Sequence, residues 1–120
     1  MAANLRRIER CFFDLDWAQT YDAGLLWTER DTHDVYLIDL NLGDRDGIEL
    51  IREARRRGCR KPLIAISSAN DRIADLRAMK AGASDFMPKD EMRPDSLERM
   101  IRYAIDRQRA EQRLVWLSRF

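Results

Sequence analysis

The chain has 120 residues, 45% of them hydrophobic, which suffices for one domain with a buried core and is too short for two. Its 22 Lys and Arg nearly balance its 21 Asp and Glu, and this balance argues against a generally basic nucleic-acid-binding protein. No apolar run approaches the roughly 20 residues needed to span a bilayer. The amino terminus also lacks the apolar stretch of a signal peptide. We therefore expect a cytoplasmic protein with no membrane segment.

The first elements are read from hydrophobic periodicity. Residues 3–10 have a helix-like pattern, and then Phe13, Leu15 and Trp17 alternate with two aspartates. This period of two predicts a half-exposed edge strand rather than a central one. Residues 21–30 read as a short helix.

The segment from Asp34 to Gly47 is the most informative part of the chain. Five of its first seven residues are apolar without alternation, which is typical of a strand covered on both faces, as in a parallel sheet. Asp39 interrupts this run near its carboxyl end, where ligands and chemistry gather in open α/β sheets. A lone acid there is a nucleophile, a metal ligand or a loop-positioning group. Asp46-Gly47 then turns the chain into a helix that stops at Gly58.

Two more apolar runs and two more helices follow. The runs are residues 63–66 and 85–87. Between them the predicted helix has its apolar face at Ile73, Leu76 and Met79, and Ser68 and Asn70 are the expected caps at its start. From Pro94 no breaker interrupts a helix of roughly 25 residues, well above the usual length.

This alternation of strands and helices predicts βαβ units with a parallel sheet. Right-handed crossovers would bring the carboxyl ends of the strands together. Asp39, Ser67 and Lys89 each lie at or just past one of those ends. A carboxylate can accept a phosphoryl group as an acyl phosphate, with a lysine to supply positive charge and a hydroxyl to donate a hydrogen bond. Such a transfer normally also needs a divalent cation held by oxygen ligands.

With these residues in place, the chain resembles the receiver domain of two-component response regulators. Asp39 in DLNLGDRDG matches the family's phosphoacceptor, and Ser67 in IAISSA matches its switch hydroxyl. Phe86 stands at the signalling aromatic position and Lys89 at the invariant lysine. The resemblance implies a flavodoxin-like α/β fold with helices on both faces and strand order 2-1-3-4-5.

The resemblance also implies phosphoryl transfer from a histidine kinase to Asp39, and no enzyme activity beyond accepting that group. In the family Mg²⁺ is held partly by two acids at the end of the first strand. Here residues 3–11 resemble the first helix and 13–18 the second strand, so the first strand is missing. Truncation, a mis-assigned start and natural degeneration remain open. With only Asp39 and the backbone carbonyl of Asn41 as ligands, we expect Mg²⁺ binding to be weak or absent.

The sequence is compatible with three candidate functions. The first is a phosphorelay receiver that signals through Ser67 and Phe86 to an output domain not present here. The second is a degenerate pseudo-receiver that acts in protein interaction and dimerisation without phosphorylation. The weakest is a flavodoxin-like cofactor binder, because the hydroxyl- and glycine-rich loop that a flavin phosphate needs is lacking.

The two ends of the chain carry the expectations about partners. Residues 1–107 are interpreted as the receiver-like domain and 108–120 as a helical connector, similar to those that precede GGDEF, PAS or kinase modules. We expect a homodimer through this helix, whose apolar cluster at 114–117 follows a polar stretch, or through the open sheet edge. At that edge, residues 13–18 would either pair with the strand at Val35, making a fourth strand, or be exchanged with a second molecule. No nucleic-acid or membrane partner is expected.

Overall fold

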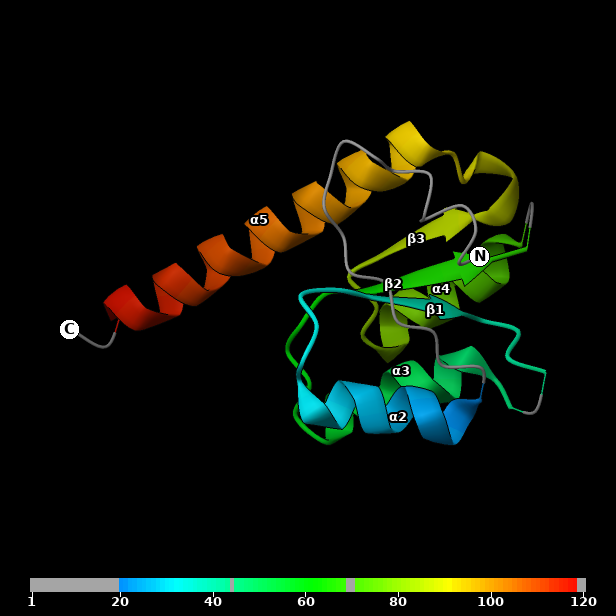
Figure 1. Ribbon diagram of the computed structural model, residues 1–120, viewed down its shortest axis with the longest axis horizontal. Coiled ribbons are helices and arrows are strands. Elements are labelled where there is room, and N and C mark those ends of the chain that lie inside the picture. Colours follow the sequence, from blue (N-terminus) through cyan, green and yellow to red (C-terminus); the bar gives the residue numbers. More distant parts are fainter. Residues whose placement is uncertain (1–19, 44, 69–70, 119–120) are drawn as a thin grey trace.

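Three short parallel strands form the centre of the computed structural model, which describes residues 20–43, 45–68 and 71–118 (Figure 1). The sheet order is β1-β2-β3, and each strand pairs in parallel with its neighbour. In chain order the elements are α2 (Tyr21–Arg30), β1 (Tyr36–Asp39), α3 (Gly47–Arg56), β2 (Leu63–Ser67), α4 (Arg72–Ala81), β3 (Asp85–Pro88), the 3₁₀ turn η1 (Lys89–Glu91) and α5 (Pro94–Ser118).

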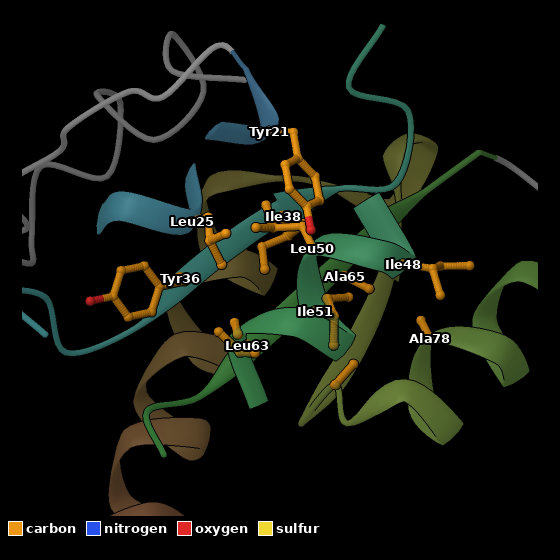
Figure 2. Packing of buried hydrophobic residues seen from close by; sticks show 12 residues of the cluster. Tyr21, Leu25, Tyr36, Ile38, Ile48, Leu50, Ile51, Leu63, Ala65 and Ala78 are labelled. Atoms are coloured by element: carbon orange, nitrogen blue, oxygen red, sulfur yellow. The ribbon is translucent and has the colours of Figure 1, made fainter. Parts of the chain in front are cut away.

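Helices cover both faces of this sheet, which confirms the predicted flavodoxin-like α/β class. Every residue of β2 is buried. Leu63 and Ala65 face a cluster built with α2, α3 and α4, most of whose members are labelled in Figure 2. Ile64 and Ile66 face a second cluster built with β3 and α5. Two cores therefore meet at one central strand, as expected for an uninterrupted apolar run.

The helices start where short polar side chains can satisfy their free N–H groups. Thr20 Oγ1 accepts from Ala23 N, 3.2 Å away, at the start of α2. Asp46 caps α3 in the same way, as the turn at Asp46-Gly47 predicted. In α4 the cap is Asp71 and not Ser68, whereas Asn70 lies outside the described residues. The expectation for Ser68 was wrong because Asp71 stands one residue before the first turn.

The large apolar side chains of α4 face outward, contrary to the prediction. Ile73 and Leu76 are 74% and 64% exposed, and Met79 is 41% exposed, so this apolar face does not point to the sheet. The buried side chains of the helix are Asp75 and Ala78. A small inward residue lets α4 lie close to β2, β3 and α3, and the larger apolar side chains then face outward.

The expected helix at 3–11, the strand at 13–18 and the missing first strand all fall outside the described residues. Within the part of the chain that the structure covers, β1 is an edge strand with a neighbour only on the β2 side. The four-stranded and exchanged arrangements both stay predictions.

The last helix extends beyond the sheet, as Figure 1 shows. It runs for 25 residues, as the absence of breakers predicted. Gln108 Nε2 donates to the Arg60 carbonyl at 3.2 Å, and residues 109–114 are exposed. No helix in the described segments combines the length and hydropathy that crossing a membrane needs.

Arg55 joins three segments at the amino-terminal end of the strands. Its Nε donates to the Gly82 carbonyl at 2.8 Å, and its Nη1 donates to the carbonyls of Cys59 and Lys61 at 2.9 and 2.8 Å. Its Nη2 donates to Ser84 Oγ at 3.1 Å. Burial lowers the pKa of the guanidinium below its ordinary value. Arg55 therefore connects the end of α3 to the loops that precede β2 and β3.

We predict that Arg55→Met lowers the free energy of unfolding by about 3 kcal/mol, because partly buried acceptors lose a charged donor. Arg52→Met, at an exposed position of the same helix, should change it by less than about 0.5 kcal/mol. Urea unfolding followed by circular dichroism measures both values. Equal midpoints for the two variants would contradict the assigned role of Arg55.

Candidate functional site

The carboxyl ends of the three strands carry the three residues that the sequence singled out. In the register of the sheet Asp39 pairs with Ile66, and the next residue of β2, Ser67, pairs with Pro88. Lys89 directly follows β3. The parallel order therefore places all three at one edge of the sheet, as predicted.

Asp39 has a partner for each carboxylate oxygen. Its Oδ1 accepts from the backbone N–H of Asn41 at 2.9 Å, within the loop that follows β1. Its Oδ2 lies 3.2 Å from Lys89 Nζ. The side chain of Lys89 is 44% exposed, so solvent screens this ion pair and its contribution to stability is small. The pair serves mainly to hold an ammonium group beside the carboxylate.

Gly47 allows the start of α3 to approach Asp39. Its N–H donates to the Leu40 carbonyl at 3.0 Å, and a Cβ at this position would lie 2.3 Å from the Asp39 carbonyl oxygen. No side chain fits in that space. Asp46, one residue earlier, caps α3 through Ile48 N at 2.9 Å. The loop between β1 and α3 is thus closed tightly over the end of the strand.

Ser67 and Phe86 differ sharply in their surroundings. Ser67 is 1% exposed, and its Oγ has no hydrogen-bond partner among the described residues. A buried hydroxyl without a partner costs about 1–3 kcal/mol, so this group is available to a ligand oxygen. Phe86 lies on β3 opposite Ala65 and is 37% exposed. It is not among the residues that line the pocket beside Asp39.

A pocket of about 420 Å³ opens beside Asp39 and includes charged residues that the sequence analysis did not select. Its polar and charged lining is Asp39, Asn41, Arg45, Asp46, Ser68, Asp71 and Arg77. Arg45 was missed because it lies in a loop without periodicity. The spacing of 71, 74 and 77 puts the N-cap of α4 and two residues of the helix on one side, a signal that the sequence does carry.

The described residues give a partial site for a divalent cation. They contain no group of three His, Cys, Asp or Glu placed to hold a metal ion. Asp39 and the carbonyl of Asn41 are oxygen donors of the kind that Mg²⁺ binds, and Mg²⁺ usually keeps several waters as its remaining ligands. Asp14 and Asp16, the two aspartates of the predicted strand at 13–18, lie outside the described residues.

The comparisons with known proteins agree with this geometry. The chain is 36% identical over 72 residues to the KDP operon transcriptional regulatory protein KdpE of Escherichia coli, covering 60% of this chain and 32% of KdpE. It is 31% identical over 96 residues to the swarming motility regulation protein RssB of Serratia marcescens, covering 79% of this chain and 43% of RssB. The chain thus spans less than half the length of either relative.

Solved structures show the same fold. A CheY-like response regulator receiver domain protein from Methanospirillum hungatei matches with a TM-score of 0.81 at 23% identity, over 92% of this chain and 88% of the other. A response regulator from Burkholderia pseudomallei, crystallised with a phosphorylated aspartic acid, calcium ion and citrate, matches with a TM-score of 0.73 at 19% identity, over 94% of this chain and 66% of the other.

The family model of the response regulator receiver domain matches residues 2–102, which include all three strands and the site at their ends. Members of this family are in general phosphoacceptors rather than enzymes, and generally bind Mg²⁺ at an acidic pocket. The chain belongs to the receiver domains of two-component response regulators.

Proposed function

We propose that this receiver domain accepts a phosphoryl group on Asp39 from a histidine kinase in the cytoplasm. The observation that carries the proposal is the 3.2 Å contact between Asp39 Oδ2 and Lys89 Nζ at the carboxyl ends of β1 and β3. A carboxylate oxygen that can act as a nucleophile and a positive charge lie together, and Asp39 lines an open pocket. The phosphorylated aspartate of the Burkholderia pseudomallei relative supports this assignment.

The transfer needs positioning and charge more than covalent help. An Asp39 carboxylate oxygen attacks phosphorus and forms the new O–P bond. The P–N bond of the donor's phosphohistidine breaks, and its electron pair stays on the imidazole nitrogen. Lys89 remains beside the oxygens that gain charge. A bound Mg²⁺ would add positive charge at the same oxygens, with Asp39 and the Asn41 carbonyl among its ligands.

Ser67 and Phe86 would transmit the change. The unpartnered, buried Ser67 hydroxyl can donate to a phosphoryl oxygen once Asp39 is modified. Ser67 lies on β2, which pairs with β3. Phe86 lies on β3, two residues before Pro88, the partner of Ser67. Movement of Ser67 toward the phosphoryl group would therefore shift the pairing that holds Phe86 at the surface.

We predict that Asp39→Asn abolishes phosphorylation by phosphoramidate or acetyl phosphate, because the amide removes the nucleophilic carboxylate and keeps its shape. Asp90→Asn, an exposed acid next to Lys89, should be phosphorylated at the wild-type rate. Intact-protein mass spectrometry in MgCl₂ measures the modified fraction. Equal modification of Asp39→Asn and the wild type would refute the assignment.

A pseudo-receiver acting as an interaction module is the alternative candidate function, and Mg²⁺ binding separates it from an active receiver. We predict weak Mg²⁺ binding, because Mg²⁺ gives up its water reluctantly and binds through few protein ligands. Isothermal titration with MgCl₂ tests this. Saturable binding at low Mg²⁺ concentration, lost in Asp39→Asn, would instead favour an active receiver.

We further propose that residues 108–120 form a connector that pairs with a second copy of the chain. Support comes from α5, which continues past Gln108 with exposed side chains, including Leu114 at 67% exposure. An apolar residue on a polar helix that leaves the domain is a typical helix-pairing position.

We predict that Leu114→Glu lowers the fraction of dimer, since a carboxylate at a paired apolar position is costly to desolvate. Gln112→Glu makes the same charge change on the same exposed turn and should leave the dimer intact. Light scattering over a concentration series measures the mass of both. A dimer that persists in Leu114→Glu would favour pairing through the sheet edge, and a monomeric wild type would refute dimerisation.

A further inference from the structure

One cation in the pocket beside Asp39 has no hydrogen-bond partner among the described residues. Arg77 projects from α4 and lines the pocket, with 58% of its side chain exposed. The nearest acid is Asp46, whose Oδ2 lies 3.9 Å from Arg77 Nη2, beyond hydrogen-bond distance. The other oxygen of Asp46 accepts from Ile48 N as the cap of α3. Arg77 is thus drawn toward the pocket without being bound there.

The other two cations near this site are already engaged. Arg45 lies over the ring of Tyr21, 3.7 Å from its centroid, and its Nη2 lies 3.2 Å from a carboxylate oxygen of Glu49. Lys89 is paired with Asp39. Arg77 is therefore the cation that can change partners at the lowest cost.

Phosphorylation would leave this pocket with excess negative charge. Three lining carboxylates, those of Asp39, Asp46 and Asp71, stand against the guanidinium groups of Arg45 and Arg77. With Lys89 beside Asp39 the charges balance. A phosphoryl group carries a charge of about −1.5 to −2, so replacing one carboxylate charge adds up to about one negative charge. The side chain that compensates this added negative charge should be positively charged, free to move and near the pocket.

Arg77 meets these conditions. Asp46, the acid nearest to it, immediately precedes Gly47, and Gly47 lies against the backbone carbonyl of Asp39. Arg77, Asp46 and Asp39 line the same pocket, so a change of the Arg77 side-chain rotamer within that pocket is the movement required. The planar guanidinium can bind two phosphoryl oxygens at once, which a lysine ammonium cannot do in the same geometry.

We propose that Arg77 is a phosphoryl-binding residue: it leaves Asp46 and binds the phosphoryl group once this group is on Asp39. This inference rests on the proposed function, and it adds a second positive contact, from α4, to the one that Lys89 makes from the end of β3. No bond is made or broken by Arg77, which contributes charge and hydrogen bonds to the oxygens of the acyl phosphate.

The test uses beryllium trifluoride, which binds a carboxylate oxygen as a phosphoryl mimic, on the full chain at constant MgCl₂. Fluorine NMR gives the concentration for half-saturation. We expect Arg77→Gln to raise it about fivefold at low salt, as for a charge-assisted hydrogen bond partly screened by solvent. Arg77→Lys should recover part of the loss, and the Arg77→Gln effect should shrink at high salt.

Arg72→Gln is the matched control, because it removes the same charge from an exposed position of α4 outside the pocket lining. It should bind like the wild type. Equal half-saturation for Arg77→Gln and Arg72→Gln, with binding still lost in Asp39→Asn, would overturn the role of Arg77 and leave the proposed function standing. If the wild type binds no beryllium trifluoride, both proposals fail together.

Discussion

The complete burial of β2 is the constraint on which the rest of the structure depends. Its five residues lie between two apolar layers, with Leu63 and Ala65 on one side and Ile64 and Ile66 on the other. Fully burying a branched apolar side chain contributes roughly 1.5–3 kcal/mol. A strand so placed must have a neighbour on each edge and a helix layer on each face, since its backbone groups and side chains cannot reach water. Ser67 is buried because it is the last residue of this strand.

That geometry explains why a hydroxyl without a partner lies at the same sheet edge as a salt bridge open to solvent. β1 and β3 lie at the two sides of β2, so Asp39 and Lys89 reach each other across the strand end and stay partly hydrated. Ser67 lies at the end of the central strand, where water is excluded. In the proposed function, a phosphoryl oxygen on Asp39 would accept a hydrogen bond from the Ser67 hydroxyl and attract Lys89 at the same time. The buried Ser67 hydroxyl lacks a partner, whereas the Asp39 carboxylate is paired and partly hydrated, so only the hydroxyl bears an uncompensated cost of burial.

Much of the fold could be predicted because periodicity and breakers act locally. The bounds of α2 and the 25-residue length of α5 follow from apolar spacing and from the positions of turn residues. The trio of Asp39, Ser67 and Lys89 followed from one rule, that parallel strands end at the same edge. Periodicity failed at α4, where Ile73 and Leu76 suggested an inward face that Ala78 occupies instead. Hydrophobic spacing identifies an apolar stripe on a helix. Close packing against the sheet decides which side of the helix faces inward.

The sequence by itself determined the kind of fold and the position of Asp39 at the end of a strand, since those depend on residue type and on order along the chain. Only the tertiary structure decided which charges surround Asp39, because Arg45 comes from a loop and Arg77 from a helix that follows the next strand. Sequence spacing does not encode the distance between such residues. The same holds for Gly47, whose necessity appears only when α3 is placed against the Asp39 carbonyl. The type and order of the residues determine which chemical groups are present, and packing determines which groups surround them.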